Sequence, residues 1–291
     1  MTAHDLSPLI QAHELQALLQ TPTDLKIIDA RFDLMKPNYG LESYLSGRIP
    51  SALRLDLEKD LCNIKTGNNG RHPIKSDDAL IQVLQKIGLN NHDHIIVYDD
   101  KSGMFASHIW WVLKHLGHDK VQLLNGGISA WKAMNGEIET ALPQKVPQGN
   151  IELRESDFNL VLMEEILEYV TGDPDYQLQI VDARGEARFK GEVEPLDPIA
   201  GHIPTAMNYP FEQNLNEMGL FKSPEVLRSQ WQTFLQGIDP SSIVNQCGSG
   251  VSACHNLFAI YYAGLGATQL YHGSWSEWCA DTTRPMATKR D

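Results

Sequence analysis

Hydrophobic and polar residues follow two patterns along this chain, and the two patterns alternate. Short apolar runs rich in β-branched residues predict buried strands at Leu25–Ala30, Ile95–Tyr98 and Val121–Leu124. Longer apolar runs with helical spacing lie between them, as in Phe105–Leu116. Ser76 precedes another run of this kind and is expected to cap its helix. Strands that alternate with helices predict an α/β protein with mainly parallel sheets covered by helices on both faces.

The second half of the chain repeats the order of the first. Asp182–Arg184 follows a predicted strand 153 positions after Asp29–Arg31, and Gly201–Pro204 follows Gly47–Pro50 by 154 positions. Further along, an offset of 147 relates Gly103 and Gly250, Gly117 and Gly264, Gly126 and Gly273, and Trp131 and Trp278. Matches in one order at a nearly constant offset indicate an internal duplication.

The duplication predicts two tandem domains, residues 1–140 and 153–291. The segment 141–152 contains Pro143, Pro147 and Gly149 and has little periodicity, so we expect it to be the linker. The Asp-Ala-Arg and Gly-x-Ile-Pro segments occur in both halves, and we interpret them as elements of the fold. Features that occur in only one half are candidates for chemistry.

Cys247 is such a feature. It follows the apolar, β-prone pair Ile243–Val244 and precedes a buried helical pattern, so it is expected at the carboxyl edge of a sheet near a helix N-terminus. Gly248 and Gly250 allow the backbone to curl and to direct several N–H groups towards one point. Such a cradle and the helix dipole favour an anion, here a thiolate. An offset of 147 places Asp100 at the equivalent position of the first half, so that half has no thiol there.

Charge and cysteine content limit the classes of function. The chain of 291 residues has a net charge of −13 and no basic stretch, which argues against nucleic acid as a partner. An anionic substrate must therefore be bound by a local basic group. Arg188 is a candidate because it lies shortly after a strand end and its counterpart at an offset of 153 is Met35.

The four cysteines form no C-x-x-C pair, so the sequence contains neither a zinc ribbon nor a thioredoxin-type motif. We expect no metal and no organic cofactor. The chain has neither a basic start followed by an apolar run nor a stretch of 18 apolar residues. We therefore expect no membrane partner and a location in a reducing cytoplasm.

The segment Cys247–Ser252, with the sequence C-G-S-G-V-S, resembles the active-site loop of the tandem-domain rhodanese family of sulfurtransferases. The resemblance extends from Asp29 to Trp278 and implies that Gly248, Gly250, Val251 and Ser252 form the active-site loop. In that family, C-G-S-G-V-T is typical of enzymes that use 3-mercaptopyruvate, whereas C-R-K-G-V-T is typical of those that use thiosulfate. The resemblance implies transfer of a sulfane sulfur through a Cys247 persulfide to a thiophilic acceptor such as cyanide or a thiol. A thioredoxin-like reductant is expected among the protein's partners.

Further site residues follow from the resemblance. Ser249 matches the loop serine of a Ser–His–Asp arrangement, and His72 and Asp60 match its other two members. Arg188 matches the arginine that binds the carboxylate or sulfonate of the donor. A second family arginine, in an E-P-R segment, is absent because Leu196 stands in its place. A carboxylate clamp would thereby lose one of its two forks.

Three other interpretations are weighed against this one. A thiosulfate-preferring sulfurtransferase would use the same residues, and a non-catalytic sulfur-binding or regulatory module would use the same fold. A cysteine phosphatase needs an arginine six residues after its cysteine, where this chain has Ala253. Cys254, seven residues after Cys247, is interpreted as core packing.

Overall fold

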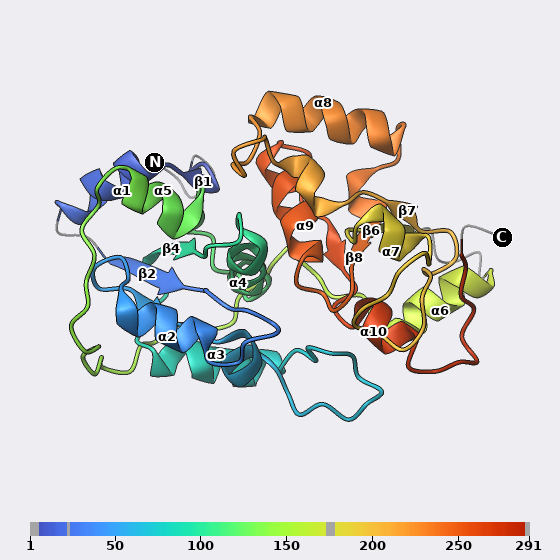
Figure 1. Ribbon diagram of the computed structural model, residues 1–291, viewed down its shortest axis with the longest axis horizontal. Helices are drawn as coiled ribbons and strands as arrows, with labels where there is room; N and C mark the ends of the chain where they lie inside the picture. Colours follow the sequence, from blue (N-terminus) through green and yellow to red (C-terminus); the bar gives the residue numbers. More distant parts are fainter. Residues whose placement is uncertain (1–5, 22–23, 173–177, 289–291) are drawn as a thin grey trace. The chain divides into compact units, whose positions relative to one another are not determined.

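The computed structural model describes residues 6–21, 24–172 and 178–288, and the chain divides into two compact units (Figure 1). The first unit comprises Met1–Cys62, Lys75–Ser156 and Glu217–Phe221. The second unit comprises Asn63–Ile74, Asp157–Asn216 and Lys222–Asp291. Each half of the sequence therefore gives one short segment to the unit formed mainly by the other half. The predicted domain boundaries did not include this exchange.

The first unit contains a parallel sheet with the strand order β1-β5-β4-β2-β3. Its strands are β1 (Leu9–Ile10), β2 (Leu25–Asp29), β3 (Leu53–Arg54), β4 (His94–Tyr98) and β5 (Val121–Leu124). Its helices are α1 (Ala12–Leu19), α2 (Tyr39–Ser46), the π-helical turn η2 (Leu57–Leu61), α3 (Asp77–Lys86), α4 (Met104–His115) and α5 (Gly127–Ala133). The predicted alternation of strands and helices is confirmed.

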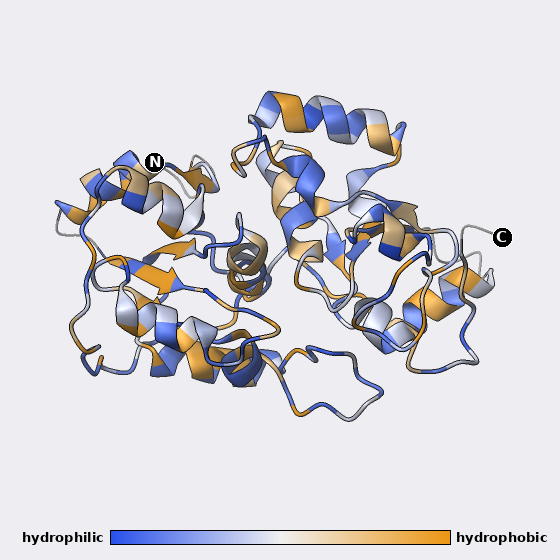
Figure 2. Cartoon of the chain, in the orientation of Figure 1, coloured by the Kyte–Doolittle hydropathy of each residue, from blue (hydrophilic) through white to orange (hydrophobic). Residues whose placement is uncertain are grey.

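Both faces of this sheet are buried. Ile27 and Ile96 pack in one cluster with Leu15 of α1 and Trp131 of α5. The next residue of β2, Ile28, points to the opposite face and is also fully buried, since successive side chains of a strand alternate between faces. Helix α4 packs against β4 and β5. Figure 2 shows hydrophobic residues in both β2 and β4.

The second unit contains a parallel sheet with the strand order β7-β6-β8-β9. Its strands are β6 (Gln179–Asp182), β7 (Met207–Asn208), β8 (Ile243–Gln246) and β9 (Gln269–Leu270). Its helices are α6 (Met163–Thr171), α7 (Glu186–Phe189), η3 (Phe211–Asn214), α8 (Pro224–Leu235), η4 (Pro240–Ser242), α9 (Ala253–Tyr262) and α10 (Ser274–Trp278). Helices α6 and α10 share a hydrophobic cluster with β6 and β8, while α9 packs on β8 and is itself covered by α8.

The repeated Asp-Ala-Arg and Gly-x-Ile-Pro segments make the same contacts in both units. The Arg31 guanidinium pairs with Asp29 and donates to the Gly47 carbonyl at 2.9 Å. Arg184 likewise pairs with Asp182 and donates to the Gly201 carbonyl at 2.7 Å. Both ion pairs are buried, so each arginine connects the end of a central strand to a distant turn. The interpretation of these segments as fold elements is confirmed.

The register of the two sheets corrects one predicted equivalence. The Ala30 N–H donates to the Tyr98 carbonyl, and the Ala183 N–H donates to the Gln246 carbonyl, each at 2.8 Å. Tyr98 therefore corresponds to Gln246, and the next residue, Asp99, corresponds to Cys247. The prediction of Asp100 is wrong by one residue, because the loop of the first unit is one residue longer than that of the second.

Two smaller findings complete the fold. Ser76 occupies the N-cap position of α3 as predicted, but its side chain makes no capping hydrogen bond there. Among the residues that the structure describes, no helix is long and apolar enough to cross a membrane.

Candidate active site

Cys247 lies at the carboxyl end of β8, in the loop that leads into α9. Its side chain is only 2% exposed. The Ser249 N–H points at the Cys247 sulfur from 3.5 Å, and the Cys247 N–H donates to the Ser274 hydroxyl at 3.1 Å. The predicted position of the thiol, at the edge of a parallel sheet and next to a helix N-terminus, is confirmed.

The first turn of α10 fixes the loop from outside. The Trp275 N–H donates to the Cys247 carbonyl at 3.1 Å, and the Ser276 N–H donates to the Gly248 carbonyl at 2.9 Å. Ser274 is fully buried and has a positive φ of 56°, a conformation that is costly for a residue with a Cβ atom. Its hydroxyl donates to the Tyr271 carbonyl at 2.9 Å while it accepts from Cys247.

Gly250 is required for the shape of the loop. Its φ is +82°, and an added Cβ atom would lie 2.5 Å from the His272 carbonyl oxygen. The Gly250 carbonyl accepts a hydrogen bond from the Cys254 thiol at 3.2 Å. Complete burial raises the pKa of Cys254 well above its ordinary value. Cys254 is therefore a neutral core residue, as its sequence position predicts.

The first unit has a carboxylate where the second has the thiol. Asp99 is fully buried, and its two oxygens accept N–H groups from four residues at 2.8–3.0 Å: Lys101, Gly103, Phe105 and Ala106. The corresponding loop of the second unit has no carboxylate at this position. Within the described part of the chain, the N–H groups of Gly250 and Ser252, which correspond to two of these donors, have no protein acceptor. The loop of the second unit thus has donors available for an anion on Cys247.

His72 and Ser249 are brought together. Both side chains are buried, and His72 Nδ1 lies 2.8 Å from Ser249 Oγ, within hydrogen-bond distance. Although His72 is in the first half of the sequence, it belongs to the second unit. Asp60 belongs to the first unit, where its carboxylate accepts the Asp56 N–H at 2.7 Å. Its role in a relay with His72 stays a prediction.

Two arginines lie against the loop. Arg188, in α7, donates to Glu194 through Nε at 3.1 Å and through Nη2 at 2.7 Å. Arg71 pairs with Asp197 at 2.5 Å. An added Cβ atom on Gly248 would lie 2.7 Å from Arg71 Nη2 and 3.4 Å from Arg188 Nη2. The sequence predicts Arg188 at this site but not Arg71.

The acidic partners of these arginines are buried, and their pKa values are shifted in opposite directions. Burial favours the neutral form of Glu194, but Arg188 and two backbone N–H groups outweigh it and hold the pKa of Glu194 below its ordinary value. Burial is also the largest influence on Asp197, and it raises the pKa of that carboxyl although Arg71 and Arg188 act in the opposite direction.

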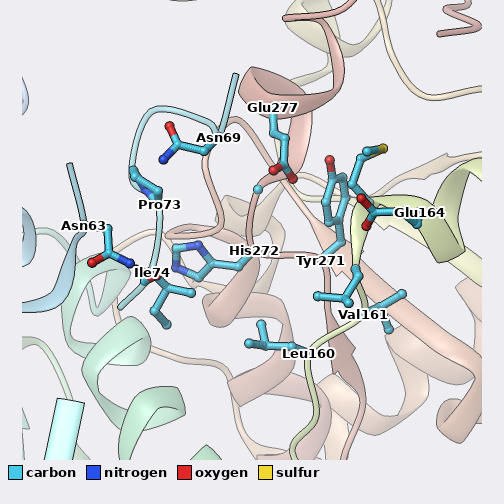
Figure 3. Close-up of a pocket in the computed structure, with 13 residues that line it drawn as sticks. Asn63, Asn69, Pro73, Ile74, Leu160, Val161, Glu164, Tyr271, His272 and Glu277 are labelled. Atoms are coloured by element: carbon cyan, nitrogen blue, oxygen red, sulfur yellow. Dashed lines mark hydrogen bonds between the residues drawn. The ribbon is translucent and has the colours of Figure 1, made fainter. Parts of the chain in front are cut away.

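A pocket of about 330 Å³, lined in part by His272, lies in the second unit (Figure 3). Figure 3 shows Tyr271, Glu164 and Glu277 gathered in one part of the pocket, with His272, Pro73 and Ile74 in another. Burial raises the pKa of Glu277, and the Tyr271 hydroxyl partly opposes this. Two carboxyl groups make this pocket unsuitable for an anion, so an anionic substrate is expected on the arginine side of the loop.

Two residues of the site were missed by sequence reasoning, Arg71 and Ser274. Arg71 precedes His72 directly, and the proximity of these two residues in sequence was a usable signal. Ser274 corresponds to Gly127 at the offset of 147, so a serine in place of a left-handed glycine was also visible as a difference between the halves.

Comparison with known proteins places the chain in a family. The rhodanese-like domain family matches residues 11–134 and 164–281. A Pseudomonas aeruginosa protein named "Probable 3-mercaptopyruvate sulfurtransferase" is 42% identical, over 96% of this chain and 98% of that protein. A Mycobacterium tuberculosis protein, provisionally named thiosulfate sulfurtransferase SseB, is 36% identical over 96% of each chain.

Solved structures agree with the sequence relatives. The structure of 3-mercaptopyruvate sulfurtransferase from Leishmania major is 29% identical, with a TM-score of 0.82 over 97% of this chain and 77% of that one. The two domain matches agree with the two similar sheets, and the relatives match over nearly the whole of this chain. The chain belongs to the rhodanese family and is a tandem-domain sulfurtransferase.

Proposed function

We propose that the protein moves a sulfane sulfur from 3-mercaptopyruvate to a thiophilic acceptor through a persulfide on Cys247. One observation carries this proposal. At the position of Cys247, the duplicated loop of the first unit binds the Asp99 carboxylate with four backbone N–H groups. The fold therefore directs backbone N–H donors at an anion in this place, and burial opposes them by raising the pKa of Asp99 above its ordinary value. In the second unit the anion is supplied by the cysteine, as a thiolate before transfer and as a persulfide after it.

The first step loads the sulfur. The Cys247 sulfur attacks the sulfur of 3-mercaptopyruvate, so that a sulfur–sulfur bond forms and the carbon–sulfur bond of the donor breaks. The electron pair of the broken bond leaves with the carbon as pyruvate enolate, and the enolate takes up the proton that the donor thiol gives up. The products are a Cys247 persulfide and pyruvate. No electrons are exchanged with any other reagent.

The second step delivers the sulfur. A thiolate or cyanide attacks the outer sulfur of the persulfide, and the electron pair of the sulfur–sulfur bond returns to Cys247 as a thiolate. Cyanide becomes thiocyanate, and a thiol becomes a persulfide of its own. A thioredoxin-like dithiol and a cytoplasmic location fit this chemistry, since the four cysteines, all within the described residues, form no disulfide.

Ser249 and His72 are proposed to assist the leaving group. In this proposal His72 holds the Ser249 hydroxyl, and the hydroxyl donates to the donor's keto oxygen as that oxygen becomes an enolate. Asp60 is proposed as the group that orients His72. The 2.8 Å separation of His72 Nδ1 and Ser249 Oγ supports the first of these two interactions.

The choice of donor follows from charge. Gly248 and Ser249 contribute no positive charge to the loop, and Arg188 and Arg71 are each paired with a carboxylate. A site of low net charge favours a singly charged carboxylate over doubly charged thiosulfate. The name of the Pseudomonas relative supports the same donor, whereas the name of the mycobacterial relative supports thiosulfate.

Steady-state rates with each donor, using cyanide as acceptor, test the proposal. We expect 3-mercaptopyruvate to exceed thiosulfate in kcat/KM, and we expect Cys247→Ser to abolish transfer while Cys254→Ser keeps most of it. Intact-mass measurement after donor treatment should show one added sulfur, on Cys247. Sulfur on a different cysteine would overturn the assignment of the nucleophile. A faster reaction with thiosulfate would overturn the assignment of the donor.

A further inference from the structure

Arg71 and Arg188 come from different segments but meet at one point of the loop. Arg71 belongs to Asn63–Ile74 and Arg188 to α7. Both guanidinium groups lie within 3.5 Å of the position that a Cβ atom on Gly248 would occupy. Gly248 directly follows Cys247, so a donor whose sulfur reaches Cys247 has both arginines within reach of its anionic end.

Asp197 already makes the contacts that a bound carboxylate would make. One of its oxygens lies 2.5 Å from Arg71 Nη1, and the other accepts from Arg188 Nη2 at 3.2 Å. Its side chain is 4% exposed. A buried carboxylate that bridges two guanidinium groups is the arrangement in which arginine pairs bind carboxylate ligands.

Leu196 provides no charge to this cluster. It is 40% exposed, and its backbone N–H donates to Glu194 at 3.0 Å. The resemblance implies a second arginine at the position of Leu196, and the second arginine of this cluster is instead Arg71, from a different segment. The backbone of Arg71 is held in place, since its N–H donates to the Ser276 hydroxyl at 2.9 Å.

We infer that Arg71 and Arg188 together bind the carboxylate of the sulfur donor, and that Asp197 is an internal competitor for the same two guanidinium groups. The inference rests on the proposed function. The donor carboxylate inserts between the arginines and weakens the contacts of Asp197. Burial raises the pKa of Asp197, so its ionised form depends on these arginines and is the weaker competitor when a ligand takes one of them.

The net charge of the cluster sets the selectivity. Arg71 and Arg188 carry two positive charges, and Glu194 and Asp197 carry two negative charges when ionised. A monoanion then adds one excess negative charge and a dianion adds two, so the dianion is disfavoured more strongly. Removal of the Asp197 charge leaves one net positive charge, and this change favours the dianion more than the monoanion.

Calorimetric titration with pyruvate and with sulfate tests the inference without requiring sulfur transfer. Pyruvate has the carboxylate of the donor but no sulfur, and sulfate is a dianion. We expect Arg71→Met to weaken pyruvate binding about tenfold or more, from the loss of one charge-assisted fork. Arg71→Lys keeps the charge without the fork and should lie between wild type and Arg71→Met. Asp197→Asn, which has nearly the same shape as aspartate, should tighten pyruvate binding about threefold and sulfate binding about tenfold.

Lys190→Met is the matched control. Lys190 lies at the C-terminus of α7 and pairs with Glu186, so its substitution removes one positive charge from the same helix outside the cluster. It should leave binding of both anions within about twofold of wild type. In the transfer assay, Arg71→Met should raise KM for 3-mercaptopyruvate more than it lowers kcat, a split that a purely structural role would not produce.

The outcomes separate this inference from the proposed function. If Cys247 takes up sulfur from 3-mercaptopyruvate but Arg71→Met binds pyruvate as wild type does, the inference is wrong and the proposed function stands. If pyruvate binding follows the expected order of variants but no donor loads Cys247, the anion site stands and the proposed function is wrong. Weaker binding of both anions by Asp197→Asn would contradict the role of Asp197 as a competitor.

Discussion

The loops that follow β4 and β8 have the same origin in the duplication but bind different anions. Both turn through a glycine in the left-handed region, Gly103 with a φ of 90° and Gly250 with a φ of 82°. In both, the anionic or thiol side chain receives an N–H from the residue two positions further along the chain, Asp99 from Lys101 and the Cys247 sulfur from Ser249. In the first unit the anion is the Asp99 carboxylate, which does not change. In the second unit the proposed anion alternates between the Cys247 thiolate and its persulfide.

The difference shows which part of the site belongs to the fold. Backbone N–H groups converge at this position in the first unit, whose loop has no thiol there, so the convergence does not depend on catalysis. The catalytic unit adds the thiol, Ser249 with His72, and the arginines, whereas Met35 of the first half, exposed to 77%, stands where the sequence repeat places Arg188. The anion-binding N–H groups therefore belong to the backbone that both units share, whereas sulfur chemistry depends on side chains of the second unit.

The largest expected effect comes from exchanging the anion of the second loop for that of the first. Cys247→Asp removes the nucleophile, and transfer should fall by about a thousandfold or more. The new carboxylate has the loop N–H groups as partners, so the melting temperature should stay above that of Cys247→Val, whose side chain accepts no hydrogen bond. Transfer rates and thermal unfolding measure both effects. A Cys247→Asp protein less stable than Cys247→Val would show that the two loops are not equivalent.

The converse change concerns the stability of the first unit. Asp99→Asn keeps the shape but removes the charge that four N–H groups share, and we expect the free energy of unfolding to fall by about 2–4 kcal/mol. Urea titration followed by far-ultraviolet circular dichroism measures this loss. Asp100→Asn is the control: Asp100 is half-buried and accepts a hydrogen bond from Tyr39, and its substitution should cost less. Equal losses for the two variants would contradict the special role of Asp99.

Ser274 offers a subtler exchange, because the first unit has Gly127 at its place with the same φ of 56°. Ser274→Gly and Ser274→Ala both remove the hydroxyl that accepts the Cys247 N–H, and each should lower kcat about tenfold by loosening the loop. The glycine variant should be the more stable of the two, since glycine adopts a positive φ without strain. Steady-state kinetics and melting temperatures distinguish the two effects. Unchanged kcat in both variants would remove Ser274 from the positioning of the loop.

The smallest effect concerns pH and the helices that follow the two loops. His108 of α4 corresponds to His255 of α9 at the offset of 147, and burial lowers the pKa of His108 to about 4. The unfolded chain binds a proton on this histidine below about pH 6.5, and the folded chain does not until about pH 4. His108 therefore reduces stability as the pH falls from about 6.5 to about 4, by up to about 1.4 kcal/mol per pH unit.

Unfolding free energies at several pH values test this effect. His108→Leu should show a flatter dependence between about pH 6.5 and 4, and substitution of the exposed His13 by Gln should leave the dependence as in wild type. An unchanged slope in His108→Leu would contradict the argument.

Much of the fold is predictable from local patterns. Apolar runs predict β2, β4, β5, β6 and β8, because central parallel strands are buried on both faces and leave an uninterrupted hydrophobic sequence. The duplication is visible because both units keep the same turns. The one-residue shift between Asp99 and Asp100 is not predictable in this way. The offset of 147 comes from glycines that follow the extra residue, and it does not apply to Asp99, which precedes that residue.

The site is predictable where its residues are adjacent in sequence, and not where tertiary packing brings distant residues together. Cys247 and its glycines are adjacent in sequence, so their pattern alone predicts an anion cradle. Arg71 lies in a turn-rich segment whose place in the second unit follows from tertiary packing, and no periodicity indicates it. The hydroxyl of Ser276, which binds the Arg71 backbone, comes from a residue 205 positions later in the chain.

The segments Asn63–Ile74 and Glu217–Phe221, which belong to the unit formed mainly by the other half of the chain, have a consequence for how the gene evolves. Arg71 and His72 are encoded in the half of the gene that lacks the cysteine, yet they belong to the catalytic unit. A gene cut between the repeats would yield a thiol-bearing fragment without its histidine and without one of its arginines. Selection for sulfur transfer therefore acts on codons in both halves. The first repeat has no nucleophile, but its loss would remove Arg71 and His72 from the catalytic unit.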